Sequence, residues 1–165
     1  MCTAASISVR DTARGVSRED IEGMREGYEL MSRRDFDAVL ARVHPDFVYE
    51  NDPGGPLSVT FHGRAAVKRF WEDFFGTWEE FRMEPYEIRE APGGRFVVRA
   101  HLVAYFEGSA EPLHMDFTHL WTVRDGMPER VRVYFDHAKA LEAAGLSKRR
   151  AGWLSQAVRT LTHRH

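Results

Sequence analysis

Apolar residues follow a helical period in the first half of the chain, and this pattern predicts three helices. The first covers residues 17–31, and its opening SRED sequence is a loose capping box. The second takes Asp35 as its N-cap and stops at Pro45. Gly63 precedes the third, which ends at Phe75 and has an unusually aromatic face.

After the third helix the period changes from helical to two-fold, which predicts strands. Four strands separated by turn sequences are expected at about 83–90, 95–106, 113–124 and 129–135. A shorter strand, DFVYEN, lies between the second and third helices, and Asp136 can cap a last short helix that ends at Gly145. Helices followed by a twisted antiparallel meander indicate an α+β fold in which one face of the sheet packs on the helices.

The central strands are apolar in both of their alternating sets of positions. A sheet with one solvated face does not need this, so both faces are expected to be covered. The helices would cover one face. A second subunit would cover the other, which predicts a homodimer formed through the outer surface of the sheet.

Length and composition indicate one domain with an extension at each end. With 165 residues, of which 43% are apolar, the chain can form one compact core but is too short for two. We expect a flexible leader over residues 1–16, the domain over 17–146, and a basic helical extension over 147–165.

Charge and cysteine content limit the classes of partner and the cellular compartment that we expect. A formal net charge of −2 argues against nucleic acid as a partner. Cys2 is the single cysteine, which excludes an internal disulfide and a cysteine-based zinc site and indicates a reducing compartment. No segment reads as a signal peptide or as a membrane span of about 20 apolar residues, so the cytoplasm is the expected location.

Three stretches, VHPDFVYEND, FHGRAAVKRFW and VRVYFDHAKALEAAGL, together with the order of the elements, resemble the SnoaL-like group of the nuclear-transport-factor-two-like superfamily. The resemblance covers roughly residues 18–146. It implies a cone-shaped, curved antiparallel sheet wrapped around the N-terminal helices, an apolar pocket inside the cone, and frequent dimers. The superfamily contains isomerases, cyclases, hydrolases and binding modules, so the resemblance alone does not assign a function.

Within that superfamily, limonene epoxide hydrolase resembles this chain most closely at YENDP. The resemblance implies that Tyr49 and Asn51 hold an attacking water and that Arg99 matches an arginine of the central strand. His101 stands where that enzyme has an aspartate, and Val133 stands where it has its general-base aspartate. The family route to epoxide hydrolysis therefore lacks its base here.

Ketosteroid isomerase resembles the same stretch through its proton-shuttling aspartate, which precedes a proline as Asp52 precedes Pro53. That enzyme also needs a tyrosine in its first helix and an acid on a later strand. Counting from the neighbouring turns places Gly27 and Thr118 at those two positions. Steroid isomerisation by that route is therefore not expected.

Two-fold alternation places Arg99 and His101 on one face of their strand, and the resemblance implies that this face points into the cone. Arg99 could then stabilise a developing alkoxide or enolate, and His101 could transfer protons near neutral pH. The candidate catalytic residues are Arg99, His101, Tyr49, Asn51 and Asp52. The candidate substrate-binding residues are Trp71, Met115, Phe117, His119, Trp121, Val133 and Phe135.

Structural explanations remain open for the candidate catalytic residues. Arg99 and His101 could face a dimer partner or solvent, or His101 could be a core histidine bonded to a backbone carbonyl. Tyr49 and Asn51 could serve packing and a turn, and an aspartate before a proline, such as Asp52, is common turn chemistry.

The histidines do not suggest a metal site. His114 with Asp116, and His101 with His119, lack a third ligand at usual spacing, so no metal and no organic cofactor is expected. The sequence favours a small enzyme that performs cofactor-independent acid/base chemistry, such as cyclisation, isomerisation or epoxide opening, on a polyketide- or terpenoid-like metabolite. The alternative is a non-catalytic binding or accessory module with the same pocket.

Overall fold

A computed structural model describes residues 18–146. The predictions for the leader over 1–16 and the extension over 147–165 therefore lie outside the described residues. The elements, in chain order, are α1 (Arg18–Ser32), α2 (Phe36–Leu40), β1 (Val48–Asn51), β2 (Val59–His62), α3 (Arg64–Phe75), β3 (Trp78–Ala91), β4 (Arg95–Phe106), β5 (Leu113–Arg124), β6 (Met127–Tyr134) and α4 (His137–Ala143). The α+β class and the last helix agree with the sequence.

The six strands form one sheet in the order β2-β1-β6-β5-β4-β3. The meander from β3 to β6 is antiparallel, as the two-fold pattern predicts. The sheet as a whole is mixed rather than antiparallel, because β1 pairs in parallel with β6. That pairing needs no tight turn, since 75 residues separate Asn51 from Met127 and carry the chain around the fold.

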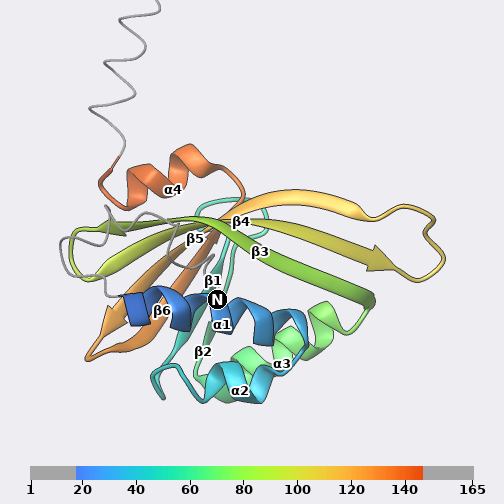
Figure 1. Ribbon diagram of the computed structural model, residues 1–165, viewed down its shortest axis with the longest axis horizontal. Coiled ribbons are helices and arrows are strands. Elements are labelled where there is room, and N and C mark those ends of the chain that lie inside the picture. The colour runs from blue at the N-terminus through green and yellow to red at the C-terminus, as the bar shows by residue number, and fades with distance from the viewer. Residues whose placement is uncertain (1–17, 147–165) are drawn as a thin grey trace, which may run out of the picture.

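The sheet is curved, and α1, α2 and α3 lie on one side of it while α4 lies on the other (Figure 1). Side chains of the main core fill the space between the first three helices and the concave, inner face of the sheet. Cross-strand pairing sets which residues share that face: Ala100 pairs with Phe117, and Val98 pairs with His119. The residues between them, such as Arg99, therefore point to the convex, outer face.

The outer face has a smaller core of its own beneath α4. Ala140 of α4 is fully buried there, against Val97 and Leu120 of the sheet. Asp136 caps α4 by accepting hydrogen bonds from the backbone N–H groups of Ala138 and Lys139. Both apolar sets of the central strands are thus partly explained within one chain, and the homodimer stays a prediction. No helix among residues 18–146 is long and apolar enough to cross a membrane.

Candidate functional site

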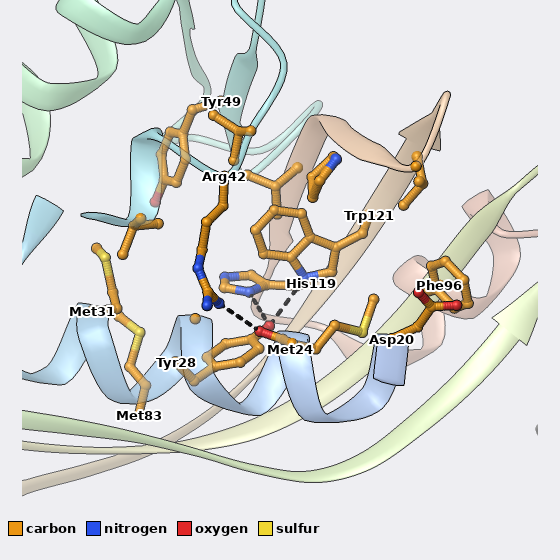
Figure 2. Close-up of a pocket in the computed structure, with 18 of the residues that line it drawn as sticks. Asp20, Met24, Tyr28, Met31, Arg42, Tyr49, Met83, Phe96, His119 and Trp121 are labelled. Carbon is orange, nitrogen blue, oxygen red and sulfur yellow. Dashed lines mark hydrogen bonds between the residues drawn. The ribbon is translucent and has the colours of Figure 1, made fainter. Parts of the chain in front are cut away.

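A cavity of about 540 Å³ lies between α1 and the inner face of the sheet (Figure 2). Its walls are mainly aromatic and sulfur-containing side chains contributed by two helices and four strands, namely Met24, Tyr28, Met31, Tyr49, Trp71, Phe75, Met83, Phe96 and Trp121. The volume is within the range of small-molecule sites in proteins. Apolar walls of this size need a few polar groups to orient a ligand, and the cavity contains them.

The principal polar group is a buried pair formed by Tyr28 of α1 and His119 of β5. The Tyr28 hydroxyl lies 2.7 Å from His119 Nδ1, and the two rings stack with centroids 5.6 Å apart. Trp121, two residues further along β5, donates its indole N–H to the same hydroxyl at 3.1 Å. Figure 2 shows the three side chains converging at the Tyr28 oxygen.

Burial controls the protonation of this pair. Loss of solvent disfavours the imidazolium, which lowers the pKa of His119 from 6.5 to about 3. Burial also raises the pKa of the Tyr28 hydroxyl, and the hydrogen bond from Trp121 only partly opposes that rise. Both groups are therefore neutral around pH 7.

A second aromatic pair, Tyr49 of β1 and Trp71 of α3, forms another part of the wall. The rings meet edge to face with centroids 5.9 Å apart. Burial raises the pKa of Tyr49, and the neighbouring indole N–H of Trp71 opposes the rise. Within the described chain, Trp71 Nε1 is buried and has no hydrogen-bond partner of normal geometry.

Charged side chains also line the cavity. Arg42, which follows α2, donates to the Gly23 carbonyl at 3.2 Å and pairs with Glu26 at 2.7 Å, so it ties α2 to α1 beside the cavity. The lining carboxylates are Glu19, Asp20, Glu90 and Asp125. Glu90 is only half-exposed, and it stands on the inner face because it pairs with Phe96 across β3 and β4.

The structure brings four of the proposed site residues to the cavity: Tyr49, Trp71, His119 and Trp121. Four other proposed site residues lie on the inner side of the sheet but do not line the cavity. The Phe117 and His119 ring centroids are 4.6 Å apart, and Val133 pairs with His119 across the strands. Met115 packs against the main core, and Asn51 Nδ2 donates to the Leu57 carbonyl at 3.1 Å.

Two further candidates occupy the surface. Asp52 has the left-handed φ of 46° and accepts a hydrogen bond from the Leu57 backbone N–H at 3.1 Å, so it serves the turn after β1. Phe135, directly after β6, is 42% exposed. Neither residue lines the cavity.

The expectation that Arg99 and His101 point into the cone is wrong, because both lie on the outer face. His101 Nδ1 is 2.7 Å from Asp116, and its Nε2 is 3.1 Å from His114. Arg99 lies 3.8 Å from Glu87 and over the Tyr86 ring. The physical reason is register: β4 presents Val98, Ala100 and Leu102 inward, opposite the inward set of β5.

The same register separates His101 from His119, which face opposite sides of the sheet. Among the described residues no group of three or more histidine, cysteine, aspartate or glutamate side chains could hold a metal ion.

Sequence reasoning missed Tyr28 as a functional residue. Counting from the turns placed Gly27 and Thr118 at the positions of a catalytic tyrosine and acid. The residues that enter the cavity are their neighbours, Tyr28 and His119, whereas Thr118 faces outward and bonds to His137 at 3.0 Å. The available signal was the position of Tyr28 in the apolar set of the first helix.

Comparison with known proteins identifies the fold and the family. A solved structure of an NTF2-like protein of unknown function from Burkholderia pseudomallei is 27% identical with a TM-score of 0.60, over 75% of this chain and 95% of that one. TerC, co-crystallised with polyporic acid, is 29% identical with a TM-score of 0.60, over 74% of this chain and 95% of that one.

A putative polyketide cyclase from Sinorhizobium meliloti is also similar, at 28% identity and a TM-score of 0.50, over 64% of this chain and 87% of that one. No curated protein shows significant sequence similarity to the chain. The sequence profile of the SnoaL-like domain matches residues 24–131, well over half of the chain. The curved sheet around its helices and this match agree: the chain belongs to the SnoaL-like domain family.

Proposed function

We propose that the protein binds a small, largely apolar, polyketide- or terpenoid-like metabolite in the cavity and performs cofactor-independent acid/base chemistry on it. The candidate reactions are cyclisation, isomerisation and epoxide opening. The observation that carries the proposal is the neutral Tyr28–His119 pair inside an aromatic cavity. Buried polar groups of this kind orient a ligand within an apolar cavity and interact strongly with charge that develops on the bound ligand.

The relatives and the cavity walls together favour an aromatic ligand. TerC was co-crystallised with polyporic acid, and another similar structure is a putative polyketide cyclase. The walls here suit such a molecule, since Tyr28, Trp71 and Trp121 offer ring faces and edges for stacking.

Acid/base chemistry also needs a proton acceptor, and His119 is too weak a base near neutral pH. Glu90 is the carboxylate that lines the cavity from the inner face of the sheet. We therefore assign it the role of proton acceptor. Glu90→Gln should abolish turnover while ligand affinity changes by less than about threefold. The matched control is Glu87→Gln on the outer face of the same strand, which should retain turnover.

A thermal-shift screen tests the binding part of the proposal, because a ligand that binds only the native state raises the melting temperature. Polyporic acid, aromatic polyketides, terpenoid epoxides and steroids are the compounds to screen. Hits are then incubated with the protein, and products are sought by chromatography and mass spectrometry. Failure of every compound class to stabilise the protein would contradict the proposal.

The competing function is a non-catalytic binding module. Val133 favours it, because this apolar residue pairs with inward-facing His119, at the position where the resemblance to limonene epoxide hydrolase implies a general-base aspartate. A hit that stabilises the protein but yields no product would support that alternative.

A further inference from the structure

We propose that Trp121 fixes the direction of the Tyr28–His119 hydrogen bond, so that His119 presents an N–H donor to the cavity and selects a ligand with an acceptor oxygen, such as a ketone carbonyl. The proposal rests on the proposed function in taking the cavity as the ligand site. It goes further by naming the chemical group that the ligand places against His119 and by giving Trp121 a positioning role.

The argument starts at Trp121, whose indole nitrogen can only donate. Its N–H lies 3.1 Å from the Tyr28 oxygen, so that oxygen must accept. Phe47 stacks on the Trp121 ring with centroids 6.2 Å apart, and Tyr28 meets it edge to face, so packing holds the indole in this orientation. One lone pair of the Tyr28 oxygen is therefore engaged.

The proton of the Tyr28 hydroxyl then needs an acceptor, because buried hydroxyls are almost always hydrogen-bonded. Among residues 18–146 the acceptor within reach is His119 Nδ1, at 2.7 Å. If His119 Nδ1 donated instead, the Tyr28 proton would have no protein acceptor. All three groups are hydrogen-bonded in only one arrangement: the Trp121 N–H donates to the Tyr28 oxygen, and the Tyr28 hydroxyl donates to His119 Nδ1.

A neutral imidazole that accepts at Nδ1 carries its proton on Nε2. Burial lowers the pKa of His119, so the ring does not gain a second proton near pH 7. His119 lines the cavity, and its bonded nitrogen is turned to Tyr28 (Figure 2), so the Nε2–H remains for a ligand. It is a neutral donor, not a base.

A neutral donor among apolar walls favours an oxygen that accepts hydrogen bonds, above all one that gains negative charge during reaction. A ketone carbonyl that becomes an enolate is such a group, and neutral histidine is known to polarise carbonyls in this way. Donation by Tyr28 to Nδ1 withdraws electron density from the ring and strengthens the Nε2–H as a donor. A neutral imidazole is too weak an acid to lose that proton near pH 7, so the residue polarises the oxygen without ionising.

Matched probes test the ligand preference. Acetylnaphthalene and ethylnaphthalene have similar shapes, but only the ketone offers an acceptor oxygen. The wild-type protein should bind the ketone about tenfold more tightly, the size expected for one added buried hydrogen bond. His119→Phe keeps an aromatic ring but removes the donor, and it should bind both probes about equally.

Nitrogen-15 NMR of the histidine side chains tests the hydrogen-bond direction without any ligand. In the wild-type protein the His119 signals should show a protonated Nε2 and a bare Nδ1. Trp121→Phe frees the Tyr28 oxygen to accept from His119, so the population with a protonated Nδ1 should rise and the ketone preference should fall. Trp78→Phe is the control, since Trp78 does not line the cavity, and it should change neither readout.

The outcomes separate this inference from the proposed function. Equal affinity of the wild-type protein for both probes, or a protonated Nδ1 in its spectrum, would overturn the inference and leave cavity binding intact. Binding of neither probe would count against the proposed function, and the wild-type spectrum would still decide the hydrogen-bond direction. If the Trp121→Phe protein fails to fold, the wild-type spectrum still decides the direction of the Tyr28–His119 hydrogen bond.

Discussion

At the scale of single residues, the cavity depends on three polar side chains that satisfy one another inside an apolar wall. Tyr28, His119 and Trp121 form a short chain of hydrogen bonds, and each stands next to aromatic rings. Such a chain is stabilising when complete and destabilising when one member is removed, because the remaining groups are left buried without partners.

Tyr28→Phe tests that dependence. The substitution keeps the ring but leaves His119 Nδ1 and the Trp121 N–H without their shared partner, so it should lower the free energy of unfolding by about 2 kcal/mol. Urea denaturation measures the change. Tyr86→Phe is the matched control, because Tyr86 is 45% exposed and its hydroxyl bonds to Asp116 on the outer face. A loss in Tyr86→Phe as large as that in Tyr28→Phe would contradict the prediction.

His119 should also make stability depend on pH. In the unfolded chain its pKa is near 6.5, and in the folded protein it is about 3. Between these values the unfolded state binds more protons, so stability is fully present above about pH 6.5 and decreases as pH falls toward 3. From pH 7 to pH 5 the wild type should lose about 2 kcal/mol more than His119→Gln, which does not titrate there. Parallel pH profiles of the two proteins would contradict this.

The residue scale also shows where sequence reasoning is weakest. The sequence pattern and the family resemblance predict Arg99 and His101 inside the cone and do not single out Tyr28, although they predict the strand and the helix that carry these residues correctly. Alternation along a strand defines two sets of residues but does not say which set faces inward. For β4 both sets contain apolar residues, since the outer set packs beneath α4. Hydrophobicity therefore does not distinguish the inward-facing set of β4 residues from the outward-facing set.

At the scale of elements, the sequence predicts most of the fold. The helical period predicts α1, α2 and α3, the Asp136 cap predicts α4, and the predicted strands at 95–106 and 113–124 coincide with β4 and β5. The parallel pairing of β1 with β6 was not predicted, because it joins segments about 80 residues apart and no local pattern encodes it. Nor did any pattern show that α4 returns to the outer face of the sheet.

Helix α4 offers a test that separates stability from the site. Asp136→Ala removes the side chain that caps Ala138 and Lys139, which should lower the free energy of unfolding by about 1 kcal/mol. Ligand affinity should not change, because α4 lies on the other side of the sheet from α1 (Figure 1), and the cavity is lined by α1 and not by α4. Calorimetric unfolding and ligand titration measure the two effects. A matching loss of affinity would show that α4 supports the cavity.

At the scale of the whole molecule, the predicted homodimer would use the part of the outer face that α4 leaves open. Arg99 and His101 lie there half-exposed, beside Glu87 and Asp116. A face with both charges present can complement a second copy of itself about a two-fold axis. Arg99 and His101, which the cavity does not use, would then belong to an interface.

Sedimentation velocity tests the assembly. The wild-type protein should sediment as a dimer, and Arg99→Glu should shift it to monomer, because the new charge stands beside Glu87 and repels the partner's acidic groups. Lys68→Glu is the control, since Lys68 of α3 lies on the other side of the sheet, where it pairs with Asp37. A wild-type protein that sediments as a monomer would contradict the predicted homodimer.

The parallel pairing of β1 with β6 has a consequence for folding kinetics. Strands β3 to β6 can pair through short turns, whereas residues 48–51 must close a long loop to reach 130–133. The meander is therefore expected to form first, with β1 and the helices docking afterwards. Because Tyr28 comes from a docking helix and His119 from the meander, the cavity would be completed in the last step. A bound ligand should accordingly slow unfolding while leaving the early refolding phase unchanged.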